Sequence, residues 1–220
     1  FIWTAFRGIP EINGWNFDQI MFVYGMQAIC AGFYEFLFAG VWGVERYIQD
    51  GELDRLLVRP INPLFSIMVA DVTFPGLGAA AFGLVICLVS LVHLKITLSV
   101  WLILFWITTI VTGTLIYFCL NMSVAVLAFK ITKVSSILMI LTNISEFSKY
   151  PTTMYSRSLQ ILLSFVIPFA FTSYFPAAYI LGIGVSPVFW AGPVIAALIC
   201  VRITAFFWNH GLKGYQSAGG

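Results

Sequence analysis

The sequence predicts an all-α integral membrane protein that crosses the bilayer several times. Of its 220 residues, 60% are hydrophobic and 9% are charged, and the mean hydropathy is +0.97. Soluble domains carry about 25% charged residues, so a chain this poor in charge cannot cover a surface exposed to water. The segment 96–129 contains no charged residue. As a helix it is long enough to cross the roughly 30 Å of hydrocarbon in a bilayer.

Further apolar segments extend along the chain. The opening, 1–6, is apolar and then meets Arg7, so we expect it to be the tail of a longer, truncated first helix. The segment 134–148 is apolar but short. The segments long enough to span a bilayer are 19–44, 64–92, about 100–128 and about 188–208.

The region before the last span is ambiguous. A polar stretch at 149–157 precedes 158–186, which has no charge but contains internal prolines such as Pro168 and Pro176. Because proline interrupts a helix, the region 149–186 is expected to be external or to form a broken, re-entrant segment. Hydropathy alone is also compatible with a full crossing of 158–186.

Basic residues predict the orientation. The loops 45–63 and 129–133 lie on one side, because two spans separate them. Their basic residues are Arg46, Arg55, Arg59, Lys130 and Lys133. The other side holds Arg7 and Lys95, with Lys149 and Arg157 added if the fifth helix crosses. Cytoplasmic loops are enriched in Lys and Arg, so we expect 45–63 to be cytoplasmic. The tail 210–220 joins it if 158–186 re-enters.

The loop 45–63 contains a predicted amphipathic helix over 51–59. Acidic residues come early in it and basic residues come late, which favours a helix because of its dipole. Its leucines fall at helical spacing on one side, and Pro60 ends it. This helix is either a connection lying in the lipid headgroups or a surface that docks a partner.

Three stretches resemble a known family. They are YIQDGELDRLLVRPINP at 47–63, the region from YPTTMY at 150–155 through RSLQILLSFVIPFAFTSYFPAAYILG at 157–182, and the ending KGYQSAG at 213–219. They resemble bacterial type-2 ABC exporter permeases, specifically the six-span family labelled uncharacterised or viologen-exporter-like. The resemblance runs from about residue 12 to the C-terminus. The family's N-terminal segment and most of its first helix are absent from this sequence.

The resemblance implies a single permease domain over 1–220 with six transmembrane helices and a re-entrant segment before the last one. It implies a second permease subunit, identical or related, and two ABC ATPase subunits on the cytoplasmic side of a bacterial inner membrane. The implied function is ATP-driven export, of the multidrug-efflux type, of a hydrophobic, amphipathic or cationic compound.

The resemblance also assigns a role to the loop helix, as a coupling helix seated in a groove of the ATPase. The residues expected to make this contact are Gly51, Glu52, Leu53, Asp54, Arg55, Leu56, Leu57, Arg59 and Pro60. No GxxxxGK[ST] phosphate-binding loop occurs in the sequence. ATP and Mg²⁺ are therefore expected in the partner ATPase, and this chain is expected to carry no cofactor, metal or catalytic site.

Three ionisable residues lie inside predicted spans: Glu35, Asp71 and Arg202. A charge at the bilayer centre costs at least about 2.5 kcal/mol, so each is expected to face protein or water. They are candidates for the substrate path or for buried structural anchors, and Asp71 could pair with Arg46 or Arg202.

Other function classes find less support in the sequence. A membrane-embedded enzyme needs clustered catalytic side chains, but His93 and His210 lie far apart. A secondary transporter is expected to carry coupling-ion sites and often an internal repeat, and neither is evident. A passive scaffold stays open. The net charge of +2 leaves no broad basic face for nucleic acid.

Overall fold

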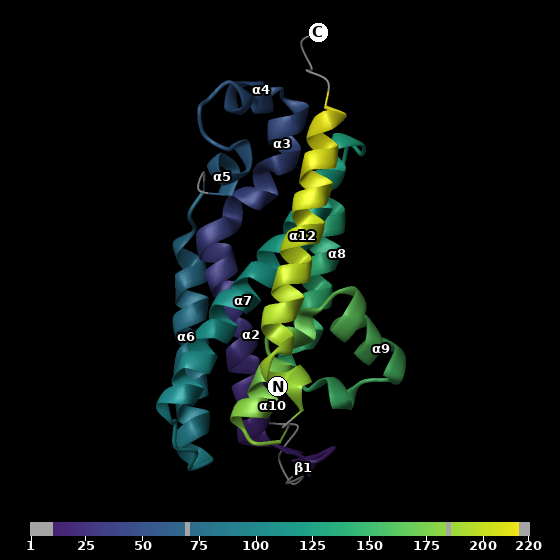
Figure 1. Ribbon diagram of the computed structural model, residues 1–220. Coiled ribbons are helices and arrows are strands. Elements are labelled where there is room, and N and C mark those ends of the chain that lie inside the picture. Colours follow the sequence, from purple (N-terminus) through teal and green to yellow (C-terminus); the bar gives the residue numbers. More distant parts are fainter. Residues whose placement is uncertain (1–10, 69–70, 184–185, 216–220) are drawn as a thin grey trace.

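A computed structural model describes residues 11–68, 71–183 and 186–215. The predicted first-helix tail at 1–6 and the final residues 216–220 lie outside the described residues. The described chain folds into an elongated helical bundle (Figure 1), which confirms the all-α fold class.

Four described helices are long and apolar enough to cross a membrane. They are the continuous helix Phe17–Gln49, α6 (Phe74–His93), the helix Val100–Phe129 and α12 (Gly192–Lys213). A bent pair, Arg157–Val166 with Phe169–Ile180, would make a fifth span if counted as one, and its two halves meet at 76°. The multi-pass architecture is therefore that of an integral membrane protein.

The first long helix is built from three parts. A small hairpin of β1 (Glu11–Ile12) and β2 (Trp15–Asn16) leads into α2 (Phe17–Phe38), which continues through the 3-10 turn η1 (Ala39–Gly43) into α3 (Val44–Gln49). Asn16 and Gln19 form a reciprocal capping box at the start of α2, with bonds of 2.9 and 3.0 Å.

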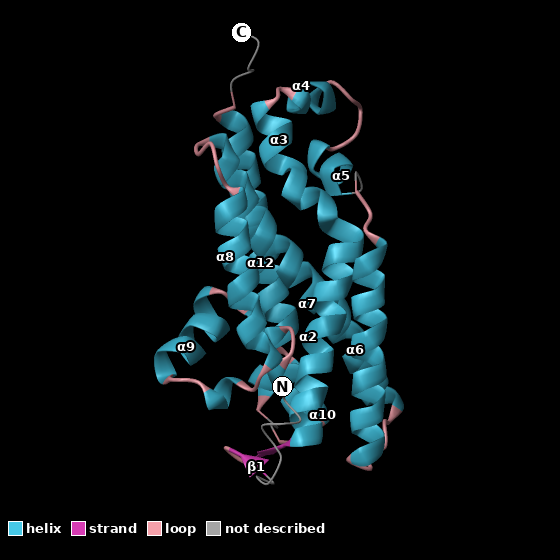
Figure 2. Ribbon diagram, turned by 180° about the vertical axis from the view of Figure 1, so that it is seen from behind, coloured by secondary structure: helices cyan, strands magenta, loops and turns pink. Residues whose placement is uncertain are grey.

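Two short helices follow at one end of the bundle (Figure 2), α4 (Glu52–Leu57) and α5 (Pro63–Met68). The chain then turns back, since 71–73 are not helical, and α6 runs antiparallel to α2.

The two helices α2 and α6 pack with their backbones in contact. Each carries two glycines seven residues apart, Gly25 and Gly32 in α2 and Gly76 and Gly83 in α6. A Cβ on Gly32 would lie 2.6 Å from the carbonyl oxygen of Gly76, and one on Gly83 would lie 2.7 Å from that of Gly25. Small residues that allow close backbone approach are typical of helix pairs in membranes.

The other side of the bundle is formed by α7 (Val100–Ala125), its 3-10 extension η2 (Val126–Phe129), α8 (Ser135–Ser145) and α12. Thr204 of α12 donates its hydroxyl hydrogen to the Cys119 carbonyl of α7 at 3.0 Å and therefore accepts the bond from the Ser123 hydroxyl at 2.9 Å. These bonds satisfy the hydroxyls where water is scarce and fix the packing of α7 against α12.

The stretch between α8 and α12 lies at the end of the bundle opposite α4 (Figures 1 and 2). It consists of η3 (Glu146–Lys149), η4 (Thr152–Met154), α9 (Arg157–Ile161), a π-helical turn (Leu162–Val166), η6 (Phe169–Phe171), α10 (Tyr174–Ile180) and α11 (Pro187–Trp190). Pro168 interrupts the helix after the π-helical turn, as its missing N–H and fixed φ require. The helix α12 then runs back, so that Lys213 lies at the same end of the molecule as α4.

Candidate functional site

The loop 45–63 is attached to the bundle through its apolar side. Gly51 has a φ of +70°, which allows the chain to turn sharply between α3 and α4. This turn places Leu53 with no exposed surface, in one core cluster with Val44, Ile48 and Val134. The first turn of α4 is therefore fixed to the protein's own core.

Two polar side chains of α3 hold the loop 129–133 and the start of α8. The Glu45 carboxylate accepts the backbone N–H of Val134 at 2.9 Å and of Ser135 at 2.7 Å. A carboxylate at a helix N-terminus satisfies unpaired donors and interacts favourably with the dipole, so Glu45 caps α8 from another element. The Gln49 amide also donates to the Thr132 carbonyl. The loops 45–63 and 129–133 therefore meet on one side of the bundle, as the sequence predicts.

The end of α12 completes this region. The ring of Phe129 makes edge-to-face contacts with Trp208 and Tyr215 at centroid distances of 5.9 and 5.8 Å. Gly211 lets the two segments approach, because a Cβ there would lie 2.4 Å from the Phe129 ring. Burial raises the pKa of Tyr215, and the adjacent Asp54 carboxylate of α4 raises it further. The coupling-loop candidate and the end of α12 are thus in direct contact.

The exposed residues of α4 and of the chain just after it differ from the docking surface that the sequence predicts. The side chains of Leu57, Val58 and Ile61 are 43%, 85% and 52% exposed, and Arg55 and Arg59 are exposed beside them. We call these five residues the outward patch. Apolar side chains exposed together mark a contact surface, either for another protein or for the membrane.

Two expectations about this helix are wrong. The helix covers Glu52–Leu57 and is shorter than the expected 51–59, so Arg59 follows it rather than belongs to it. The leucines do not share an outward face, because Leu53 is buried and Leu56 packs partly against the same core. Glu52 and Asp54 are partly buried. An amphipathic pattern shows which residues form one apolar face. It does not show whether that face packs against the chain's own core or against a partner.

The three ionisable residues expected inside spans divide into two places, and Asp71 lies outside the span helix, in the non-helical residues 71–73 that precede α6. Glu35 and Asp71 line one pocket of about 380 Å³ together with Trp42 and Thr73. The Thr73 hydroxyl donates to the Glu35 carbonyl at 2.7 Å and holds the start of α6 against α2. Arg202 lies on the outward side of α12. The sequence analysis did not predict that Glu35 and Asp71 share a pocket, and the structure brings them together.

The expected pairing of Asp71 is not found. Within the described ranges, no ion pair joins Asp71 to Arg46 or Arg202. Glu35, Asp71 and Arg202 are all exposed on the single chain, so none of them is a buried anchor within this subunit.

A second pocket, of about 850 Å³, lies at the opposite end of the bundle between α2, α6 and the segment 143–155. Aromatic rings line it, and the Lys149 ammonium lies 5.6 Å from the centroid of the Tyr24 ring while it pairs with Glu146. This arrangement could not be predicted from the sequence beyond its aromatic richness, because Tyr24 and Lys149 lie far apart in the chain.

Comparisons with known proteins address the family. A family model described as ABC-2 family transporter protein matches residues 1–219. Neither the curated proteins nor the solved structures include a match. The match spans nearly the whole chain and agrees with the multi-pass helical bundle of the structure. The chain therefore belongs to the ABC-2 family of transporter proteins, as a type-2 ABC permease, the membrane component of an ABC transporter.

Proposed function

We propose that this chain is the permease subunit of an ATP-driven exporter and that the outward patch docks a cytoplasmic ABC ATPase. The observation that carries the proposal is the way the patch is presented. It lies at the tip of α4, and the residues behind it are fixed by Leu53, Glu45 and the end of α12. A surface that must transmit force needs such a rigid backing.

Helix length supports docking over a position in the headgroups. The continuous helix Phe17–Gln49 has 33 residues, which corresponds to about 50 Å at roughly 1.5 Å per residue. A bilayer including its headgroups is about 40–45 Å thick. If α2 begins at the outer boundary, α4 stands beyond the inner headgroups, where a soluble partner can reach it.

The proposal assigns the remaining roles as follows. Two ATPase subunits bind ATP and Mg²⁺, and a second permease subunit, identical or related, faces this one. The segment 149–186 re-enters at the outer side as part of a six-helix subunit. The side chains of Glu35, Asp71 and Arg202 are exposed on the single subunit. Because a charge that faces lipid is costly, this exposure supports a second subunit that covers them and a polar path between the two subunits. The exported compound is hydrophobic, amphipathic or cationic, and the membrane is a bacterial inner membrane.

The central test replaces Val58, the most exposed member of the patch, with aspartate. We expect Val58→Asp to reach the membrane in normal amounts and to lose most of the ATPase that co-purifies with wild type, because the change puts a desolvated charge in an apolar contact. The matched control is Val100→Asp, since Val100 is 75% exposed at the first position of α7, where an acidic side chain suits the helix dipole. Unchanged co-purification and hydrolysis for Val58→Asp would reject the docking role.

Topology is tested separately. In a background without the four buried native cysteines, a cysteine at position 58 is expected to react with an impermeant thiol reagent only after the cells are permeabilised. A cysteine at Thr97, exposed between α6 and α7, is expected to react in intact cells. Labelling of position 58 without permeabilisation would invert the orientation.

A further inference from the structure

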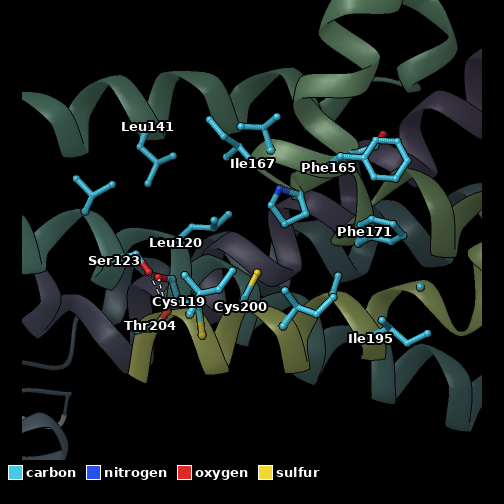
Figure 3. A pocket seen from close by; sticks show the side chains of 18 of the residues that line it. Cys119, Leu120, Ser123, Leu141, Phe165, Ile167, Phe171, Ile195, Cys200 and Thr204 are labelled. Carbon is cyan, nitrogen blue, oxygen red and sulfur yellow. Dashed lines mark hydrogen bonds between the residues drawn. The ribbon is translucent and has the colours of Figure 1, made fainter. Parts of the chain in front are cut away.

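A cavity of about 650 Å³ lies between α7, α8, α12 and the π-helical turn (Figure 3). It is separate from the outward patch and from the pocket of Glu35 and Asp71. In Figure 3 the side chains of Leu120, Leu141 and Ile167, from different elements, are directed into one common space. Its location inside the span of α12 places it within the hydrocarbon region.

The cavity does not offer a site for water. Its lining is apolar apart from the hydroxyls of Ser123, Ser164 and Thr204. Two of these are bonded within the protein, because Ser123 and Thr204 are 2.9 Å apart and Thr204 donates to the Cys119 carbonyl. A buried water needs two to four polar partners, and the remaining hydroxyl, that of Ser164, does not supply them. The volume corresponds to about 20 water molecules at roughly 30 Å³ each, far above the voids of a packed interior.

The shape of the cavity follows the membrane normal. Every fourth residue of α12 from Ile195 to Phe207 lines it. Twelve helical steps correspond to about 18 Å, more than half of the roughly 30 Å hydrocarbon thickness. A long, narrow, apolar space in this direction matches an extended alkyl chain better than a compact solute.

The cavity is also continuous with the surface that faces lipid. Three of its lining residues, Phe165, Val166 and Ile195, are 76%, 65% and 54% exposed, so they form the mouth. The mouth opens onto an apolar strip of α12 that includes Leu198, which is 62% exposed. An acyl chain can therefore enter sideways from the bilayer without any polar group crossing hydrocarbon.

We propose that this cavity is a binding site for one acyl chain of a membrane phospholipid. The chain lies along α12 and packs between it and the π-helical turn. The acyl chain supplies the dispersion contacts that the side chains lining the cavity otherwise lack. The bent segment 157–180 is consequently held in place partly by lipid.

The test uses the full-length permease in nanodiscs that contain a phosphatidylcholine with a photoreactive diazirine in one acyl chain. After illumination and proteolysis, we expect the label on peptides from the π-helical turn and on the cavity side of α12. Replacing Ile199, a lining residue one helical turn from Ile195, with tryptophan should fill the cavity behind the mouth and reduce labelling of the π-helical turn several-fold. The matched control is Leu198→Trp, at the preceding residue of α12, which has similar exposure but does not line the cavity; it should leave that labelling unchanged.

Several outcomes would overturn the proposal. One is equal labelling on all exposed faces of α12, with no difference between Ile199→Trp and Leu198→Trp. Another is no labelling of the π-helical turn together with cross-links from a second permease subunit to the same peptides, which would make the cavity a protein interface. If Ile199→Trp does not give a monodisperse protein, Val166→Trp, at the opposite edge of the mouth, replaces it and carries the same expectation.

Discussion

Replacing Gly76 with leucine is expected to abolish accumulation of the folded permease in the membrane. A Cβ at this position would lie 2.5 Å from the Phe36 amide nitrogen and 2.6 Å from the Gly32 carbonyl oxygen, and both atoms belong to backbone. A side chain there forces α2 and α6 apart along their whole contact. Overpacking of a core typically costs about 1–3 kcal/mol, and the cost is higher where rigid backbone must move.

The matched control lies two residues away. Gly78 is exposed in the same helix, and a Cβ there would meet nothing within 4 Å. Gly78→Leu is expected to accumulate like wild type, because both substitutions change helix propensity alike and only one meets the backbone of α2. Membrane fractions and size-exclusion profiles measure the difference. Equal, normal accumulation of both variants would contradict the backbone contact between α2 and α6.

Replacing Glu45 with alanine is expected to uncouple α8 from the loop 45–63. The change removes the acceptor for the N–H groups of Val134 and Ser135. Hydrogen bonds to charged groups contribute about 1.5–3 kcal/mol, and less where solvent screens the charge, as it does at Glu45. We expect a lower melting temperature in detergent. If α8 takes part in transport, substrate-stimulated ATP hydrolysis should also fall while the ATPase still co-purifies.

Two variants separate these effects. Glu45→Gln keeps a carbonyl acceptor without the charge, so it should retain part of the stability that alanine loses. Glu52→Ala removes a carboxylate from α4 with no bond to α8 in the described structure, and should leave the melting temperature near that of wild type. A melting temperature for Glu45→Ala equal to that of wild type would show that the capping contact contributes nothing.

The sequence predicted the spans because the bilayer itself imposes their length and composition. Three of the four long helices lie close to where hydropathy placed them, since each must satisfy its own backbone and bury an apolar surface. The expected span 64–92 is the exception, because its long helix begins only at Phe74, after α5 and the non-helical residues 71–73. Hydropathy does not tell which helices touch. The pairing of α2 with α6 had a signal in the sequence, two glycines seven residues apart in each helix, but this spacing acquires meaning only when the helices are known to be neighbours.

The candidate site was predicted in outline and missed in detail. The loop 45–63 does form a helix at one end of the bundle, but Leu53 faces the core and the exposed apolar residues extend past the helix to Ile61. The pocket shared by Glu35 and Asp71 was not foreseen, because it depends on where η1 bends and where α6 begins. Capping by Glu45 was also missed, since its partners lie 89 and 90 residues away.

The two arms that carry the loop 45–63 differ mechanically. On one arm, helical structure continues from α2 through η1 to the end of α3 at Gln49, although Phe38 at the start of η1 leaves the helical dihedral angles (φ −132°, ψ 25°). On the other arm, α5 ends at Met68 and 71–73 lack helical hydrogen bonds, so displacement is absorbed there as a hinge. A push on α4 would therefore reach the far end of the bundle more directly through α2 than through α5, and α6 would follow because its glycines pack it against the backbone of α2. The loop acts as a lever with one continuous helical arm and one hinged arm, and α2 and α6 move together.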